Sequence, residues 1–168
     1  MKLKSWVAAG ALFLVSTGAA IAANLTAPEG PVILEVSGEI ANLNGDGVAQ
    51  FDMAMLRQLD WREIETYTSF TTGMQSFAGP TLASLLAAVG AEGDRLNATA
   101  INDYFVEIPV ADADAHNVIL AAEMNGKRMR IRDKGPIWVI YPLSEAEAAK
   151  KPFDTEMIWQ MNRLEVLD

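Results

Sequence analysis

The stretch of sequence that decides the fold is FAGPTLASLL, residues 77–86. From Leu82 to Val89, leucine and valine recur at i, i+3, i+4 and i+7, the spacing of a helix that buries one face. Pro80 is expected in the first turn of this helix, where its missing N–H costs little, and Gly90 is expected to end it. The stretch therefore predicts one well-defined amphipathic helix near the middle of the chain.

On both sides of this helix, apolar residues alternate with polar ones, which is typical of half-buried strands. Strands are expected at residues 32–36, 48–51, 61–70, 98–101, 104–108, 117–124, 127–132, 137–141 and 157–166, and further short helices at 53–59 and 144–151. Asp52 is expected to cap the first of these short helices. The predicted class is α+β: a mixed, β-rich single domain with few short helices.

Asn125-Gly126 is the strongest short-range hairpin signal in the chain, because both residues tolerate positive φ. A two-residue loop at this point sets the register of the flanking strands. In that register Leu120 faces Ile131 and Ala122 faces Met129, so the apolar pairs fall on one side.

The opposite face of the predicted hairpin carries Arg128, Arg130 and Arg132, spaced roughly 7 Å apart along an extended strand. Lys134 extends this series. Arginine offers planar, bidentate donors, so the series predicts an anion site. The alternative is a solvated sheet face whose charge is balanced by acids such as Glu123.

The amino-terminal residues have the pattern of a secretory signal peptide. Lys2 and Lys4 precede an apolar run over residues 6–15, and a small-x-small cleavage pattern occupies residues 20–22. Residues 1–22 are therefore expected to be a cleaved signal peptide, leaving residues 23–168 as one domain. The leader has no twin arginine, which indicates a Sec-type signal and a periplasmic or secreted protein without a membrane anchor.

Composition excludes several classes of function. The formal net charge is −9, or −11 once residues 1–22 with their two lysines are removed, which disfavours nucleic acid as a partner. The chain has no cysteine and one histidine, His116. Thiolate metal ligands, redox dithiols and multi-histidine metal sites within one chain are thus excluded.

Five stretches taken together resemble the oxidoreductase molybdopterin-binding domain, which has the sulfite-oxidase type of fold. They are residues 51–59, 66–73, 77–86, 103–109 and 132–142. In active relatives the turn after the Thr-rich strand carries a cysteine whose thiolate binds molybdenum, and the resemblance puts that position at or beside Thr71. A hydroxyl is a poor ligand for such a site, so no cofactor is expected, with molybdopterin as the alternative.

The candidate site combines the positions that the resemblance implies with the basic series. It consists of Thr71, Thr72, Gly73, Asp103, Tyr104, Arg128, Arg130, Arg132 and Lys134. Tyr67 and Trp138 are candidate aromatic walls. Asp103 also suits a simple turn.

Three functions remain open at this stage. The first is a non-catalytic module that binds an anionic small molecule or a periplasmic protein partner. The second is a molybdopterin-dependent oxidoreductase that holds its cofactor without a cysteine. The third is a hydrolase that uses His116 as a general base beside a Ser or Thr.

Overall fold

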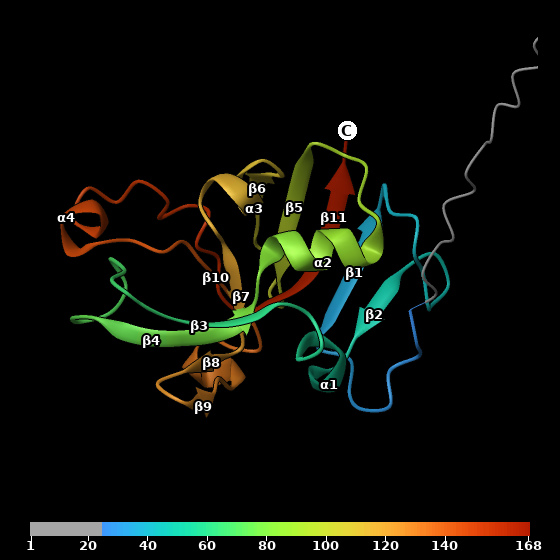
Figure 1. The fold of residues 1–168 in the computed structure, drawn as a ribbon, viewed down its shortest axis with the longest axis horizontal. Helices are drawn as coiled ribbons and strands as arrows, with labels where there is room; N and C mark the ends of the chain where they lie inside the picture. Colours follow the sequence, from blue (N-terminus) through green and yellow to red (C-terminus); the bar gives the residue numbers. More distant parts are fainter. Residues whose placement is uncertain (1–24) are drawn as a thin grey trace, which may run out of the picture.

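The computed structural model describes residues 25–168, so the predicted signal peptide lies outside the described residues. Within the described part of the chain, no helix is long and apolar enough to cross a membrane. The strands form three sheets and the helices are short, so the α+β, β-rich class is confirmed (Figure 1).

The largest sheet has five strands in the order β2-β1-β11-β5-β6. Its strands are β1 (Leu34–Gly38), β2 (Ala49–Phe51), β5 (Arg95–Ala100), β6 (Phe105–Pro109) and β11 (Met161–Leu167). β1 and β11 run parallel, and the other neighbours are antiparallel. Helix α2 (Leu82–Val89) lies across one face of this sheet (Figure 1) and buries its apolar side in the main core.

A second sheet has four strands in the order β3-β4-β8-β9. They are β3 (Trp61–Thr66), β4 (Gln75–Pro80), β8 (Glu123–Met124) and β9 (Lys127–Arg128), and a separate pair joins β7 (Ile119–Ala121) to β10 (Trp138–Ile140). A smaller core lies between these two sheets, around Phe77 and Trp138, whose rings meet edge to face at 5.3 Å.

The predicted central helix is confirmed, with one correction. Gly90 ends α2 in the left-handed conformation, with φ of +62°. Pro80, however, is the last residue of β4 rather than part of the first helical turn. The cap is Thr81, which follows it.

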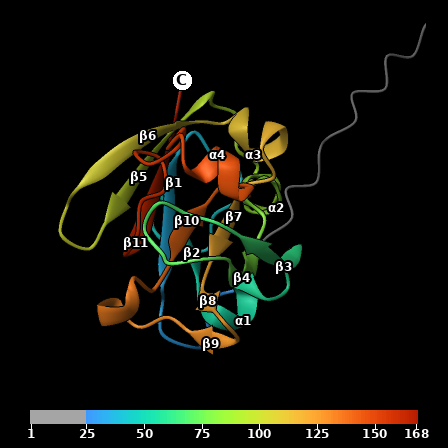
Figure 2. The same ribbon diagram turned by 90° about the vertical axis from the view of Figure 1, so that its left-hand side faces the viewer.

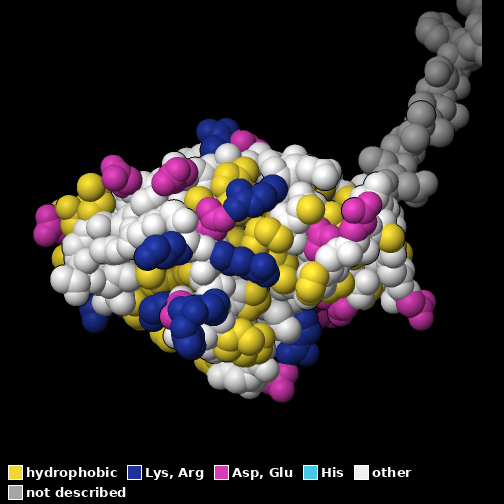
Figure 3. Space-filling model, turned by 90° about the horizontal axis from the view of Figure 1, so that it is seen from below, with side chains coloured by type: hydrophobic (Ala, Val, Ile, Leu, Met, Phe, Trp, Pro, Cys, Tyr) yellow, Lys and Arg dark blue, Asp and Glu magenta, His cyan; other side chains and the backbone are white. Residues whose placement is uncertain are grey.

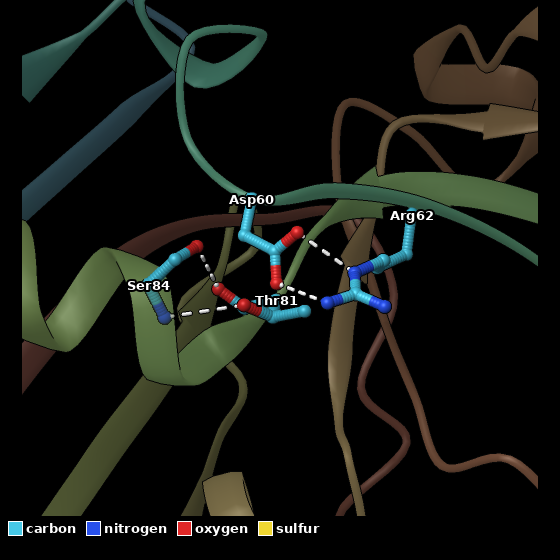
Figure 4. A network of polar contacts seen from close by, with 4 residues as sticks. All are labelled: Asp60, Arg62, Thr81 and Ser84. Atoms are coloured by element: carbon cyan, nitrogen blue, oxygen red, sulfur yellow. Dashed lines mark hydrogen bonds and ion pairs between the residues drawn. The ribbon is translucent and has the colours of Figure 1, made fainter.

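Polar contacts fix the start of α2 against β3 (Figure 4). Thr81 Oγ1 accepts a hydrogen bond from Ser84 N at 3.2 Å, and Ser84 Oγ donates to Thr81 O at 2.8 Å. Thr81 N donates to Asp60 O at 2.9 Å, while Asp60 accepts two hydrogen bonds from the Arg62 guanidinium. The bidentate ion pair holds the pKa of Asp60 below its usual range.

The remaining helices are single turns. They are α1 (Met53–Leu56), α3 (Asp112–Ala115) and α4 (Glu145–Ala148). Asp52 caps α1 as predicted, and a capping box starts α4. Neither α3 nor β4 was among the elements expected from the sequence. The turn between β3 and β4 lies with α4 at the left end of Figure 1, the end that faces the viewer in Figure 2.

The predicted hairpin forms at its turn but ends early. Glu123 pairs with Arg128 in β8 and β9, and Met129 N donates to Ala122 O at 2.9 Å. Beyond that point the prediction is wrong, because Leu120 in β7 pairs with Val139 in β10 rather than with Ile131. The chain leaves the hairpin to complete a different sheet.

The prediction that Arg128, Arg130 and Arg132 share one strand face is also wrong. β9 ends at Arg128, and residues 131–133 form a 3-10 turn, η1 (Ile131–Asp133). The carbonyl of Arg130 accepts hydrogen bonds from Asp133 N at 2.7 Å and Gly135 N at 2.9 Å, so it is used to close the turn. Period-two alternation is lost once the backbone turns.

Candidate functional site

The turn after β3 is where the resemblance puts a metal-binding cysteine. β3 ends at Thr66, whose Oγ1 accepts a hydrogen bond from Leu143 N at 2.6 Å. The expected strand over 61–70 therefore stops four residues early. Thr68 is buried, and its Oγ1 lies 2.9 Å from Thr71 Oγ1 and accepts from Phe70 N at 3.2 Å. The Thr71 hydroxyl is thus engaged within its own turn.

Thr72 and Gly73 continue this turn at the protein surface. The carbonyl of Thr72 accepts a hydrogen bond from Gln75 Nε2 at 2.7 Å. Gly73 has φ of +67°, and no atom lies within 4 Å of the position that a Cβ would occupy. Both residues shape the turn into β4.

A cleft of about 310 Å³ lies beside this turn. Aromatic, aliphatic and polar side chains line this cleft. The lining residues are Phe70, Ala100, Asn102, Tyr104, Asp154, Thr155, Met157, Ile158, Trp159 and Gln160. The rings of Phe70 and Trp159 meet edge to face with centroids 5.1 Å apart. The cleft therefore has a broad apolar wall with hydrogen-bonding groups at its margin.

Lys134 places a cation behind this aromatic wall. Its Nζ lies 4.1 Å from the ring centroid of Trp159, 4.9 Å from that of Trp138 and 5.9 Å from that of Phe70. Among the described residues, no carboxylate oxygen lies within 4.0 Å of it. Burial lowers the pKa of Lys134 below its usual range. The cation is stabilised by ring faces instead of by an acid.

Two hydrogen bonds from Gln160, one from its backbone and one from its side chain, hold the loop around Lys134 against the cleft. The carbonyl of Lys134 accepts a hydrogen bond from Gln160 N at 3.0 Å, and Gln160 Nε2 donates to Ile131 O at 2.7 Å. Gly135 packs so closely that a Cβ would lie 2.2 Å from Met129 O. Only glycine can be accommodated at this close approach, so Gly135 is required for the conformation of this loop.

The structure divides the predicted site residues between separate places. Tyr104 lines the cleft, Lys134 lies behind its wall, and Thr71 is next to Phe70 in the chain. Asp103 lies in the β5–β6 turn with φ of +65°, and its carboxylate is 2.5 Å from Arg163 Nη2.

The predicted arginine series lies elsewhere. Arg128, Arg130 and Arg132 line a second and larger groove, which does not share lining residues with the cleft.

The two predicted aromatic walls do not line the cleft. Trp138 is fully buried beneath it and donates from Nε1 to Met157 O at 3.0 Å. Tyr67 packs against the main core. Sequence reasoning missed Trp159, Gln160 and Asn102, because they come from separate segments that only the fold brings together.

His116 has surroundings that do not suit a hydrolase. Its ring packs against Phe153 with centroids 4.7 Å apart, and its Nε2 lies 4.0 Å from Asp112 Oδ1. In the described part of the chain, His116 makes no hydrogen bond to a serine or threonine. A histidine general base needs the nucleophile within hydrogen-bonding distance, so the geometry around His116 does not support the hydrolase hypothesis.

The donor set does not fit molybdenum held by a protein thiolate. The chain has no cysteine, and the Thr71 hydroxyl contacts Thr68. Across residues 25–168 there is no group of three His, Cys, Asp or Glu side chains that could hold a metal ion.

Residues 49–152, more than half of the chain, match the family described as the oxidoreductase molybdopterin binding domain. The chain belongs to this family. The resemblance drawn from the five sequence stretches is thereby confirmed. No curated protein has a sequence that matches the chain.

Among solved structures, this family member is similar to the sulfane dehydrogenase SoxCD from Paracoccus pantotrophus. The TM-score is 0.60 at 18% sequence identity, and the match covers 80% of this chain and 38% of that one. At this identity the match shows the fold, and this chain corresponds to well under half of the SoxCD chain.

Proposed function

We propose that this member of the molybdopterin-binding family is an exported, non-catalytic module that binds a small anionic ligand with a planar face in the cleft beside Thr71. One observation carries the proposal: the chain has no cysteine, and Thr71, at or beside the position where the resemblance implies a metal-binding cysteine, is hydrogen-bonded to Thr68. The chain therefore has the family's fold without a thiolate to bind molybdenum.

The shape of the cleft supports a planar ligand. The adjoining rings of Phe70 and Trp159 line the cleft, and so does Tyr104, which is exposed. Aromatic rings bind flat apolar surfaces by offset or edge-to-face contacts. Asn102 also lines the cleft, where its side-chain amide can orient a polar substituent.

The charges around the cleft support an anion. Lys134 lies against the rings of Phe70 and Trp159, which line the cleft, and among the described residues it forms no ion pair with an acid. Asp154 is the acid that lines the cleft, and its Oδ1 accepts a hydrogen bond from Ser69 Oγ at 2.5 Å. A ligand that directs its negative group toward the Lys134 side therefore gains attraction in a partly desolvated setting.

Elemental analysis of protein purified from its native compartment tests the absence of molybdenum chemistry. We expect substoichiometric molybdenum and no pterin fluorescence after acid extraction. One molybdenum per chain would overturn the proposal. It would instead favour the alternative, an oxidoreductase that holds molybdopterin without a cysteine, for which the family match is the supporting observation.

The ligand class is tested with 2-naphthoate, a planar anion, and 2-naphthamide, its neutral analogue. We expect naphthoate to bind more tightly and the Trp159→Ala variant to lose most of the affinity for both, as measured by isothermal titration calorimetry. Leu43→Ala, a substitution of an exposed apolar residue away from the cleft, is the matched control. Equal affinity of parent and Trp159→Ala protein would exclude the cleft as the binding site.

A further inference from the structure

The second groove is lined by segments that are distant in sequence, including Pro136 and, in β11, Asn162. It has a volume of about 760 Å³ and is open to solvent. The segment that leads into β1 lines it with Val32 and Ile33, and residues 128–132 line it as well. Ile101, from the β5–β6 turn, also lines the groove.

Exposed apolar side chains converge in this groove. Val32, Ile101 and Ile131 are 45%, 38% and 56% exposed. They are three of the eight large apolar residues that are exposed in the described part of the chain, and all three line the same groove. Scattered single apolar residues are ordinary on a protein surface, whereas a group gathered in one concavity marks a binding surface.

The same groove concentrates positive charge in an acidic protein. Arg128, Arg130 and Arg132 line it, and the Arg130 and Arg132 side chains are mostly exposed. Asp133 offsets part of this charge, since its carboxylate lies 2.7 Å from Arg130 Nε and 3.8 Å from Arg132 Nε. Three guanidiniums against one carboxylate leave a local excess of two positive charges, on a chain whose formal net charge is −9.

Seen from below, basic and apolar side chains are interspersed over this face of the molecule (Figure 3). A compact anion such as phosphate needs several donors converging on one point. Here, in contrast, Arg130 is turned toward Asp133, and the 3-10 turn separates Arg132 from β9. A groove that separate segments line with both apolar and basic side chains instead fits a peptide chain that carries apolar and acidic side chains.

We propose that this groove binds an acidic, partly apolar peptide segment of a protein partner. Charge complementarity selects the acids of the segment, and its apolar side chains cover Val32, Ile101 and Ile131. The inference does not depend on the proposed ligand cleft, because the two share no lining residue. The arginines thereby act as a docking surface and not as part of the cleft.

The test uses the full mature chain and a fluorescein-labelled decapeptide of alternating glutamate and valine, read by fluorescence anisotropy. We expect saturable binding that weakens as sodium chloride is raised from 50 to 500 mM, because exposed charges are screened. A peptide of alternating lysine and valine lacks the acids that the arginines attract, and a peptide of alternating glutamate and serine lacks the apolar side chains. Each should therefore bind at least about fivefold more weakly than the glutamate–valine peptide.

Two variants separate the contributions of charge and apolar contact. The double variant Arg128→Gln/Arg132→Gln should weaken peptide binding about tenfold, as should Ile131→Ser, while circular dichroism stays unchanged. Arg95→Gln and Leu43→Ser are the matched controls, because both residues are exposed and lie outside the groove. Trp159→Ala should leave peptide binding intact, which keeps this test distinct from that of the cleft.

Three outcomes would overturn the proposal. The first is equal binding of the acidic peptide by the parent and by the groove variants. The second is dimer formation that Ile131→Ser abolishes, which would make a second copy of this chain the occupant. The third is binding to vesicles of phosphatidylglycerol that competes fully with the peptide and exceeds it in affinity, which would assign the face to a lipid surface.

Discussion

Lys134 holds its ammonium nitrogen 4.1 Å from the ring centroid of Trp159, with Trp138 and Phe70 also within 6 Å. A lysine in such surroundings is partly desolvated, and its neutral form gains relative to its charged form. The cation is therefore both the charge that favours an anion in the neighbouring cleft and a charge that can be removed by alkali sooner than usual.

The first prediction concerns the pH dependence of ligand binding at this lysine. The pKa of Lys134 is lowered by burial, so its charge is lost as pH rises through a value below 10.5. A carboxylate ligand is already ionised above pH 6. We expect the affinity for 2-naphthoate to stay level near neutral pH and to fall toward pH 10, as measured by calorimetry.

Lys134→Met provides the control for that experiment. This variant should bind 2-naphthoate about fivefold more weakly at pH 7, in line with the loss of one partly exposed charge contact, and its affinity should not fall toward pH 10. Binding of 2-naphthamide should be the same in both proteins. A fall of equal size in the Lys134→Met protein would assign the pH effect to another group.

The second prediction concerns the buried carboxylate of Asp52, which joins the amino-terminal arm to α1. Its oxygens accept hydrogen bonds from Met55 N at 2.9 Å, Gly30 N at 2.7 Å and Glu29 N at 2.9 Å. These donors, Met55 N foremost, hold the pKa of Asp52 below its usual value. The ionised form is thus stabilised by folding, and this contribution is present above about pH 3.8 and is lost as pH falls through the folded-state pKa.

Asp52→Asn should therefore lower the melting temperature by a few degrees at pH 7, and the difference from the parent should shrink below pH 3.8. Thermal unfolding followed by circular dichroism measures both. Asp46→Asn, in the exposed turn before β2, serves as the control and should leave the melting temperature unchanged. A difference that persists unaltered at pH 2 would contradict the role of the charge.

The third prediction compares two glycines with opposite requirements. A Cβ at Gly79 would lie 2.0 Å from Leu120 O, where β4 approaches β7, whereas a Cβ at Gly73 would meet nothing within 4 Å. Gly79→Ala forces two backbones apart and should lower the free energy of unfolding by at least about 2 kcal/mol. Gly73→Ala meets only the strain of positive φ and should cost about 1 kcal/mol. Urea unfolding gives both values, and the reverse order would refute the close approach of β4 and β7.

The fourth prediction concerns Tyr141, which is fully buried and donates from its hydroxyl to Asp112 Oδ2 at 2.8 Å. Burial, together with the neighbouring carboxylate, raises the pKa of Tyr141 well above its usual value. Removing the hydroxyl in Tyr141→Phe deletes a hydrogen bond to a charged group and should lower the free energy of unfolding by about 2 kcal/mol. Tyr104→Phe, at an exposed position, should change it by less than about 0.5 kcal/mol.

Predictions that depended on local signals agree well with the structure. Leu82 to Val89 form a helix that ends at Gly90, Asp52 caps the helix at Met53, and Asn125-Gly126 makes the predicted turn. In each case the physical cause lies within a few residues: a periodic apolar face, a side-chain cap or a tolerated positive φ. Such features need no distant partner.

Predictions that assumed a strand would continue were less accurate. The predicted strand that carries the arginine series continues past Arg128, and the predicted Thr-rich strand continues past Thr66. In the structure, the strands end at these two residues. In both places a distant segment ends the strand. Leu143 N hydrogen-bonds to Thr66, and Leu120 pairs with β10 instead of with the second strand of the hairpin. Sequence patterning cannot reveal these contacts, because the partners are far apart along the chain.

Composition and local patterning were enough to establish the class of fold, the central helix, the membership of the molybdopterin-binding family and the lack of any cysteine to hold a metal. The packing of distant segments, in contrast, divides the candidate site between two places, with Lys134 against the aromatic cleft and Arg128, Arg130 and Arg132 in another groove. The reason is that composition and local periodicity are properties of the chain. A site, in contrast, depends on which side chains the packing of distant segments brings within a few ångströms of one another.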